Sequence, residues 1–596
     1  MYVFLALAPI LVVLVLLVIL RLPAKISMGV AYLVTALLAL FVWHASGAQV
    51  AAATVNGIIV ALTLLFIVFA AILLLNTLKE GGAIVAIRKG FMDISPDRRI
   101  QAIIVAWLFC SMVEGSSGFG TPSAIGAPLL LALGFPAMAC VMAVLIIQST
   151  PVSFGAVGTP VLLGVWTGID DKPDIAQAIA PLSPENYLLQ ITANIGLIHA
   201  VVGFLIPLIL SAFLTRFFGE KRSFIEGLKV WPFAIFAGLS FTIPYYLVAK
   251  YLGPEFPSLV GGFIGLMIVL PAAKRGFLMP KEIFHFAPRA SWDKDWLGTL
   301  TEEKFDDTVA PKFSLIRAFS PYLIVIALLI LTRTIAPLKA FLTGDLTSFG
   351  FKNLFGTTIS SNIQLAYSPG TILIVTSLIC ILLFNMNGAM VKRSWRNSAV
   401  TMVAAAPALL FSVPMVQVFI NSGSAADVAN ALPAMPILLA ESAAGAFQNA
   451  WPMISPWIGA MGAFIAGSNT VSNMMFAYFQ WSTATQIGLD GNLAGQVVAL
   501  QAVGGAAGNM ISVHNVVAAC AVVGLMDKEG YVIRKTLLAM TYYVIQAGLI
   551  GMGLIFGQLW WWILAVIWPI AFFGIMAMIS KNAAASVKIA EQNRVN

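Results

Sequence analysis

Charge is scarce in this sequence, and positive charge is missing from two long stretches. Only 10% of the 596 residues are charged, whereas 60% are hydrophobic; soluble domains carry about 25% charged residues. Residues 101–168 contain one charged side chain, Glu114, and residues 397–526 contain neither Lys nor Arg. A composition this apolar excludes a soluble globular protein and predicts an all-α polytopic membrane protein.

Cysteine is also rare, and nucleotide-binding motifs are missing. The four cysteines lie inside apolar segments, so they predict neither disulfides nor a metal site. No GxxxxGK[ST] loop occurs, which argues against ATP as the energy source. The net charge of +8 comes from short loops between apolar runs, a pattern typical of membrane orientation signals. We therefore predict no cofactor, no metal and no nucleic-acid partner, with lipid surrounding the chain.

Apolar runs of about 20 residues indicate about 12–14 transmembrane segments. The first run, Met1–Leu20, has no basic start and no small-residue cleavage site, so it is interpreted as a spanning helix. The loops at 79–99 and 216–229 are basic, whereas the loop 170–186 carries four acidic residues and one Lys. Because basic loops face the cytoplasm, we expect a bacterial inner-membrane protein with its N-terminus outside and its C-terminus inside.

Gly, Pro, Ser, Thr and Asn crowd the two stretches that lack Lys and Arg. The first reads EGSSGFGTP and then QSTPVSFGAVGTP; the second contains GSNTVSNM and then GGAAGNMISVHN. Unpaired backbone groups are costly in lipid, so broken backbone at membrane depth occurs only where protein buries it or where it lines a cavity. Two such stretches in one chain indicate a transport site.

Loop charges require residues 100–170 to cross the membrane an odd number of times and residues 397–527 an even number. A re-entrant hairpin followed by a broken helix satisfies both conditions. The hairpins are predicted at about 102–132 and 453–487, and the broken helices at about 137–169 and 495–526.

These two pairs have opposite orientation and so form an inverted repeat. Such repeats place their binding site at the midplane, between the two halves. We expect the first repeat at 1–220, two connecting spans and a cytoplasmic loop at 221–316, and the second repeat at 317–596.

An anionic substrate in this region must find donors other than Lys and Arg. Half-helix N-termini offer free N–H groups, to which hydroxyl and amide side chains can add. The alternatives are that the small residues only pack helices together, or that the breaks are simple kinks. The candidate substrate-binding residues are Ser116, Ser117, Gly118, Thr121, Ser149, Thr150, Ser468, Asn469, Thr470, Asn473, Asn509 and Ser512.

Two ionisable residues are candidates for ion coupling. Glu114 is an intramembrane carboxylate, a costly feature that is usually functional, although it could instead cap the Gly-rich hairpin tip. His514, beside the second helix break, could titrate or donate to a carboxylate. A packing role is the alternative for His514, and it is favoured more strongly for His199, which lies in a helix without breaks.

Several motifs resemble the lactate permease family. They are EGSSGFGTPSAIGAPLL at 114–130, STPVSFGAVGTP at 149–160, GSNTVSNMMF at 467–476, GGAAGNMIS at 504–512 and GLMDKEG at 524–530. The resemblance covers nearly the whole chain. It implies a bacterial symporter for L-lactate, D-lactate or glycolate, usually coupled to protons and built on a broader ion-transporter fold.

Three positions depart from the family pattern. Asn469 stands where an Asp is usual and Asn509 where a Lys is usual, and His514 replaces the usual Gln. The Ser468-Asn469-Thr470 triplet also resembles the hairpin tip of sodium-coupled dicarboxylate carriers, which are dimers that work by an elevator motion. By analogy, this chain is expected to form a homodimer and to move in the same way.

We therefore expect a secondary active symporter for a small 2-hydroxymonocarboxylate, lactate first and glycolate second, coupled to H⁺. The alternative is a Na⁺-coupled carrier of another organic anion, such as a dicarboxylate. A passive anion channel would need a continuous pore, which two dead-end hairpins do not provide. An enzyme is not expected, because the sequence has neither a zinc motif nor a GxSxG elbow.

Overall fold

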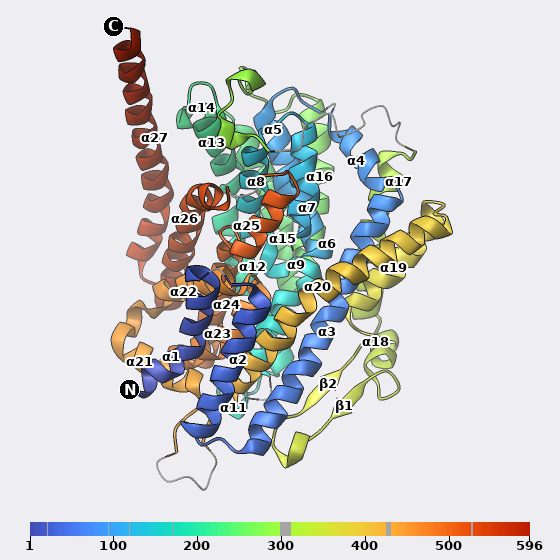
Figure 1. Ribbon diagram of the computed structural model, residues 1–596, viewed down its shortest axis with the longest axis vertical. Coiled ribbons are helices and arrows are strands. Elements are labelled where there is room, and N and C mark those ends of the chain that lie inside the picture. Colours follow the sequence, from blue (N-terminus) through green and yellow to red (C-terminus); the bar gives the residue numbers. More distant parts are fainter. Residues whose placement is uncertain are drawn as a thin grey trace.

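The computed structural model describes residues 1–20, 22–92, 94–118, 120–170, 172–298, 312–424, 431–525 and 528–595. Nearly all of this part of the chain is helical (Figure 1). Ten of the helices described are long and apolar enough to cross a membrane, or eleven if the bent pair at 388–420 counts as one span. The prediction of an all-α polytopic membrane protein is confirmed.

The N-terminal helices, drawn in blue, lie at the front of the molecule in Figure 1. Apolar residues surround α3 on all sides, as expected for a helix enclosed by lipid and other helices. This helix packs along α20, from the second half of the chain. The N-terminal elements are α1 (Tyr2–Val13), the π-helical η1 (Leu14–Ile19), α2 (Ala24–Phe41), α3 (Gly47–Glu80) and α4 (Ala83–Met92).

The first Gly-rich stretch forms two helical arms and then a broken helix. The first arm ends at Ser117, and the second begins at Thr121. The Arg98 guanidinium donates to the Leu133 carbonyl, so the first arm begins close to where the second arm ends. The arms comprise α5 (Arg98–Ala102), η2 (Ile103–Phe109), α6 (Cys110–Ser117) and α7 (Thr121–Ala132). The broken helix comprises α8 (Ala137–Ile146), η3 (Ile147–Ser149), η4 (Pro151–Phe154), α9 (Gly155–Thr159), η5 (Pro160–Val165) and α10 (Trp166–Ile169).

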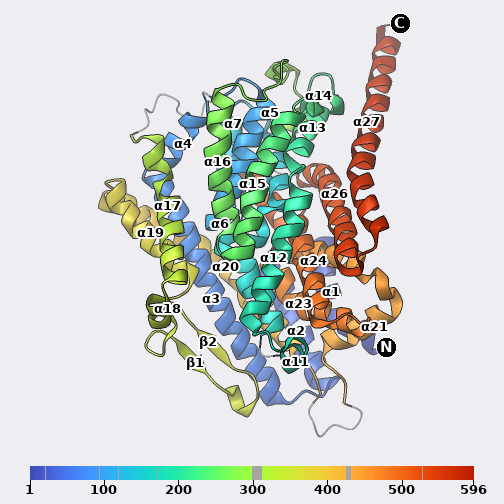
Figure 2. The same cartoon turned by 180° about the vertical axis from the view of Figure 1, so that it is seen from behind.

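The middle of the chain supplies long helices that enclose the broken helix. Figure 2 shows α12, α15 and α16 side by side, and α16 packs against α6. These elements are α11 (Pro173–Ile179), α12 (Pro184–Gly203), α13 (Ile206–Phe218), α14 (Phe224–Leu228), α15 (Trp231–Tyr251), α16 (Pro257–Lys274), η6 (Arg289–Ser291) and η7 (Lys294–Trp296). Part of the loop predicted at 274–316, residues 299–311, lies outside the described residues.

A short β-hairpin follows α18 and lies at the lower end of the molecule in Figure 1. Its strands pair antiparallel, with Phe349 opposite Ile363 and Gly350 opposite Asn362. The elements of this region are α17 (Leu315–Thr334), α18 (Ala336–Thr343), β1 (Phe349–Phe351), η9 (Leu354–Gly356), β2 (Ser361–Ile363), α19 (Pro369–Leu383), α20 (Gly388–Ile420), α21 (Met435–Phe447) and η10 (Gln448–Ala450).

The second Gly-rich stretch repeats the pattern of two arms and a broken helix. The arms α22 and α23 meet at Gly467 and Ser468, and the helix that follows is interrupted at 509–512. The elements are α22 (Trp451–Ala466), α23 (Asn469–Gln486), α24 (Gly491–Gly508), α25 (Val513–Ala521), α26 (Glu529–Phe556) and α27 (Leu559–Val595).

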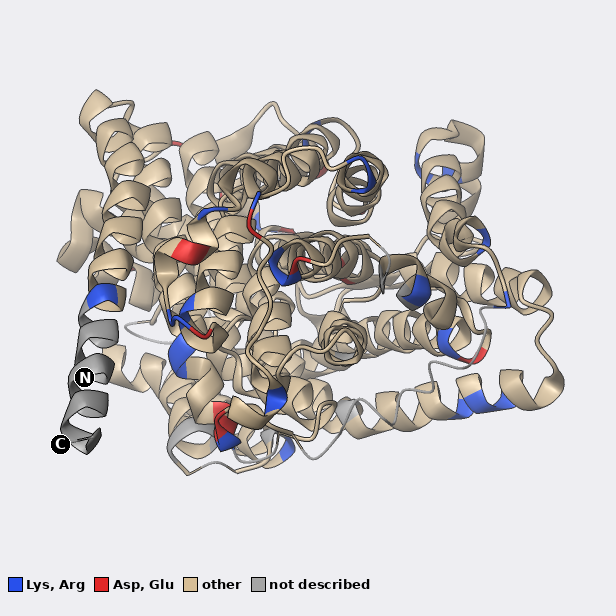
Figure 3. Cartoon of the chain, turned by 90° about the horizontal axis from the view of Figure 1, so that it is seen from above, with Lys and Arg blue, Asp and Glu red and all other residues tan. Residues whose placement is uncertain are grey.

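The two ends of the molecule differ in charge. Figure 1 places α4, α5 and α14, which border basic loops, at the upper end, and α11, beside the acidic loop, at the lower end. Seen from above, several helix ends and loops of the upper end carry Lys or Arg (Figure 3). This arrangement agrees with the sorting of loops by charge along the sequence.

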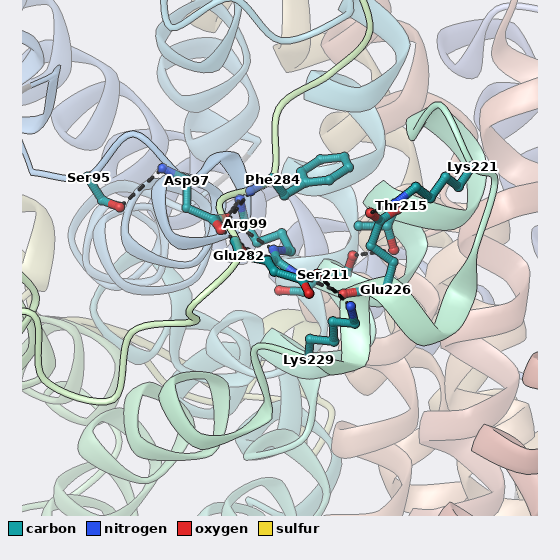
Figure 4. Close-up of polar contacts among 10 residues, drawn as sticks. All are labelled: Ser95, Asp97, Arg99, Ser211, Thr215, Lys221, Glu226, Lys229, Glu282 and Phe284. Carbon is teal, nitrogen blue, oxygen red and sulfur yellow. Dashed lines mark hydrogen bonds and ion pairs between the residues drawn. The ribbon is translucent and has the colours of Figure 1, made fainter.

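A buried ion pair anchors the base of the first pair of arms (Figure 4). The Asp97 carboxylate accepts from the Arg99 backbone N–H (2.8 Å) and guanidinium (2.7 Å), and from the Phe284 N–H (3.0 Å). The Arg99 guanidinium also donates to the carbonyls of Glu226 (2.7 Å) and Glu282 (2.8 Å). Asp97 thus caps α5, and the ion pair joins α5 to α14 and to the loop at 282–284, which are distant in sequence.

Candidate functional site

The two hairpin tips, where the arms meet, and the interruptions of the two broken helices lie together in the middle of the bundle, away from both ends (Figure 1). The α6 arm packs against η4 and α9 of the first broken helix, and α25 of the second broken helix packs against α7 and α8. From the second pair of arms, α23 packs against η5 and α10. The first broken helix therefore contacts arms of both hairpins, and the second broken helix contacts the first hairpin and the first broken helix.

Glu114 lies on the last turn of α6 and faces the first helix break. Its side chain is only 4% exposed. A Cβ atom on Gly155, the first residue of α9, would overlap its Oε1 atom, and Oε2 has no hydrogen-bond partner. Among the described residues, no Lys or Arg forms an ion pair with Glu114. The predicted coupling residue is therefore a buried carboxyl group without a cationic partner.

The first hairpin tip is held against a strained turn. Gly118 has φ +55° and ψ −153°, a conformation that residues other than glycine rarely adopt. A Cβ on Gly118 would lie 2.7 Å from that of Ala156. Ala156 (φ 43°) and Val157 (φ 55°) are left-handed, which costs about 1–2 kcal/mol per residue for L-amino acids. Such strain persists only where the surrounding structure imposes it, and it is common at functional sites.

The N-termini of α23 and α25 come together at the second hairpin tip. A Cβ on Gly467 would lie 3.1 Å from Cβ of His514 and 3.9 Å from Oγ of Ser512. Ser468 and Ser512 occupy the N-cap positions of α23 and α25, but neither side chain caps its helix. The Ser512 Oγ is buried without a hydrogen-bond partner. Two positive helix ends with uncommitted hydroxyl groups are suited to binding an anion.

Asn469 and Asn473 lie one turn apart on the inner face of α23. The Asn473 Nδ2 donates to the Pro160 carbonyl (3.1 Å), and the Asn469 Nδ2 donates to Ser153 Oγ (3.5 Å), so both asparagines bind the first broken helix. Neither Oδ1 atom has a donor. A Cβ on Gly505 of α24 would overlap the Asn469 Oδ1 and lie 3.6 Å from the Asn473 Oδ1. Two unpaired acceptor oxygens thus converge at one point of α24.

Several predicted substrate-binding residues are already bonded within the protein. Ser116 donates to the Val113 carbonyl and lies 3.2 Å from the Ser117 hydroxyl. Ser149 donates to the Ile146 carbonyl.

The other candidates differ in their surroundings. The Thr121 hydroxyl and the Asn509 Oδ1 are buried without partners. The Thr470 carbonyl lies against Gly164, and the His514 side chain is exposed.

A polar bridge between the two halves is formed by side chains that lie beside the helix breaks. Gln148 donates to Ser123 Oγ (2.9 Å) and accepts from Asn515 Nδ2 (3.2 Å). A Cβ on Gly120 would lie 3.6 Å from the Asn515 Oδ1. The first hairpin, the first break and α25 are joined at this point.

His199, for which the sequence favoured a packing role, has a hydrogen-bond partner at each ring nitrogen. Its Nε2 lies 2.8 Å from Ser153 Oγ and its Nδ1 2.6 Å from the Tyr543 hydroxyl. These partners are 46 and 344 residues away, so no local pattern around His199 could reveal them.

The family profile described as L-lactate permease matches residues 3–556. The chain belongs to the L-lactate permease family. The family consists of permeases, and together with the many apolar helices it identifies a multi-pass membrane transport protein.

Relatives within the family cover most of the chain. A putative L-lactate permease of Haemophilus influenzae is 32% identical over 520 residues, which covers 84% of this chain and 88% of the relative. The L-lactate permease of Escherichia coli K12 is 29% identical and covers 79% of this chain and 80% of its own length. The glycolate permease GlcA of the same strain is 27% identical, with coverage of 92% and 94%.

Proposed function

We propose that this protein is a secondary active symporter that carries a small 2-hydroxymonocarboxylate together with a proton. Lactate is the first candidate substrate and glycolate the second, because relatives across nearly the whole chain are L-lactate permeases and a glycolate permease. The proposed cycle contains no chemical step. The observation that carries the coupling is the buried Glu114 carboxyl group, which faces a helix break without a cationic partner.

The substrate carboxylate binds between the N-termini of α23 and α25. Ser468 and Ser512 do not cap these helices, so their hydroxyl groups and the first-turn N–H groups are free to donate to an anion. No cationic side chain is needed, because each helix N-terminus carries about half a positive charge.

Glu114 couples this binding to a proton. An ionised Glu114 and an ionised substrate in the same cluster of helix breaks would repel each other strongly, because the surrounding protein has a low dielectric constant. A proton on Glu114 removes one of the two charges. Neutralisation also relieves the cost of a buried carboxylate without a partner. Substrate and proton therefore bind and leave together.

A Na⁺-coupled carrier is the second candidate, and one observation favours it. The unpaired Oδ1 atoms of Asn469 and Asn473 converge at Gly505, and uncommitted oxygen atoms beside a helix break are suited to binding Na⁺. This version of the function uses the asparagine oxygens, rather than Glu114, to hold the coupling ion.

The two sets of arms and broken helices support alternating access between inward-facing and outward-facing states. We infer an elevator motion and a homodimer by analogy, in a bacterial inner membrane with the N-terminus outside. The basic upper end shown in Figure 3 is then cytoplasmic.

Uptake of labelled L-lactate into proteoliposomes tests the proposal. An inward proton gradient is expected to drive accumulation, and Glu114→Gln is expected to abolish accumulation while lactate exchange without a gradient continues. Glu441→Gln, which changes an exposed carboxylate on α21, is the control and should behave as wild type. Accumulation driven by sodium alone would favour the second candidate. No lactate uptake under either gradient would refute the proposed substrate.

A further inference from the structure

His199 occupies a fully buried position between the two halves of the chain. It lies on α12 with no exposed surface, and Tyr245 and Tyr543 pack around its ring with centroids 6.0 and 5.7 Å away. Both ring nitrogens have partners, Ser153 on the first broken helix and Tyr543 on α26. The function proposed above assigns no role to this histidine.

The hydrogen bonds of Ser153 determine which ring nitrogen of His199 carries the proton. A serine hydroxyl has one hydrogen, and Ser153 donates it to the Ala502 carbonyl (3.1 Å). Ser153 must therefore accept from His199, which requires a proton on Nε2. Because both ring nitrogens of a neutral histidine cannot donate, Nδ1 is an acceptor and the Tyr543 hydroxyl donates to it.

The chain of hydrogen bonds continues with the same direction on the other side of Tyr543. Its hydroxyl hydrogen points to His199, so its oxygen accepts from the Thr150 hydroxyl, 3.0 Å away. The complete order is Thr150 to Tyr543 to His199 to Ser153 to the Ala502 carbonyl. A network in which every hydrogen is committed holds its members in one arrangement.

This arrangement determines how Asn469 is oriented. Its amide contacts Ser153 Oγ at 3.5 Å, and Ser153 has no hydrogen left to donate. Only the NH₂ group of Asn469 can face Ser153, so the Oδ1 atom must turn toward Gly505 on α24, where it has no donor. The unpaired oxygen at the second hairpin therefore follows from the Ser153 hydrogen bond to the Ala502 carbonyl, which His199 maintains because its donating Nε2 cannot accept the Ser153 hydrogen.

We propose that His199 is a positioning residue of the transport site, which acts through Ser153 to aim the Asn469 amide. The role in transport rests on the proposed function, because it requires that Asn469 contact the substrate or its coupling ion. The direction of the hydrogen bonds does not depend on the substrate.

Two conservative variants separate the bonds of His199. In His199→Gln, the amide nitrogen reaches the position of Nε2 and can still donate to Ser153. In His199→Asn, the shorter side chain can accept from Tyr543 but cannot reach Ser153. We expect the KM for L-lactate uptake to stay within about twofold of wild type in His199→Gln and to rise about fivefold in His199→Asn and in Ser153→Ala. Equal KM values in the Gln and Asn variants would overturn the proposal.

A spectroscopic measurement tests the same inference without any substrate. Protein labelled with ¹⁵N-histidine and placed in nanodiscs should give one buried histidine signal of the neutral form with the proton on Nε2, absent in His199→Gln and shifted in Ser153→Ala. A signal with the proton on Nδ1, or on both nitrogens at neutral pH, would overturn the proposal. If wild-type protein fails to take up lactate but gives the expected signal, the proposed substrate is wrong and the inferred direction of the hydrogen bonds stands.

Discussion

Glu114 and Gly155 lie so close together that a single methyl group on Gly155 would overlap the Glu114 carboxyl oxygen. The only charged side chain between residues 101 and 168 is thus packed onto the point where the first broken helix changes direction. Gly155 itself has φ −67°, which any residue can adopt. Glycine is needed at this position because a side chain would occupy the space of the Glu114 carboxyl group, and not because of the backbone conformation.

Gly155→Ala is therefore expected to displace the Glu114 carboxyl group. Overpacking of a filled interior costs about 1–3 kcal/mol, an amount that movement of the carboxyl group or of the α6 arm must absorb. We expect proton-driven accumulation of lactate to fall at least about tenfold, with the protein still folded, as measured by uptake into proteoliposomes and by size-exclusion chromatography.

Gly445→Ala is the matched control, because a Cβ atom on that residue of α21 would meet nothing within 4 Å. Its uptake should equal that of wild type. If Gly155→Ala also transports at the wild-type rate, the contact between Glu114 and the first break has no part in coupling.

The positions of the breaks could be predicted from composition because each break uses residues with special backbone properties. Pro151 and Pro160 lie at the first broken helix, and Gly118 and Gly467 have positive φ at the two hairpin tips. The apolar runs and loop charges likewise predicted an all-α membrane protein, because lipid imposes both patterns.

The contacts inside the site could not be predicted in this way. Asn469 meets Ser153 across 316 residues of sequence, and the Tyr543 hydroxyl meets His199 across 344. The α12 segment around His199 looks like an ordinary apolar helix, because the residues that give the histidine its role come from other helices. The β-hairpin of β1 and β2 was missed because each strand has only three residues.

Gly505→Ala is expected to disturb the second hairpin as Gly155→Ala disturbs the first. The new methyl group would overlap the Asn469 Oδ1, and its distance from the Asn473 Oδ1 would be 3.6 Å. We expect the KM for L-lactate to rise at least about fivefold, because the asparagine amide must rotate or α23 must move. Gly530→Ala, with open space around the added methyl group, should leave the KM unchanged. An unchanged KM in Gly505→Ala would exclude Asn469 from binding.

Asp97→Ala is expected to destabilise the protein severely. Loss of this carboxylate leaves the Arg99 guanidinium, 1% exposed, without its counter-charge, and breaking a buried ion pair costs about 3–5 kcal/mol. The matched control is Asp293→Ala, because Asp293 pairs with Arg222 on the surface, with side chains 58% and 38% exposed. Surface pairs contribute about 1 kcal/mol or less. Thermal unfolding in one detergent should therefore show a much lower midpoint for Asp97→Ala, and similar midpoints for both variants would refute this role of the pair.

Ser512 and Ser472 provide a comparison between a binding hydroxyl and a structural one. Both side chains are fully buried, but the Ser512 Oγ has no partner, whereas the Ser472 Oγ donates to the Gly459 carbonyl (2.9 Å) and accepts from Gln501 (3.0 Å). Ser472→Ala removes both bonds of the hydroxyl and leaves the Gln501 amide only its longer bond to the Ser472 carbonyl (3.4 Å), which should cost about 1–3 kcal/mol of stability. Ser512→Ala removes no bond from the protein itself, so its stability should match wild type.

The KM for L-lactate should show the opposite pattern to stability, because it should change in Ser512→Ala and not in Ser472→Ala. If the Ser512 hydroxyl donates to the substrate carboxylate, Ser512→Ala should raise the KM for L-lactate about fivefold or more, because hydrogen bonds to charged groups are stronger than neutral ones. Ser472→Ala should keep the wild-type KM in whatever fraction remains folded. The thermal midpoint and the KM together separate the two roles, because Ser472→Ala should change only the midpoint and Ser512→Ala only the KM. A Ser512→Ala variant with a lowered midpoint and an unchanged KM would place this hydroxyl in the fold and would remove the α25 N-terminus from the proposed anion site.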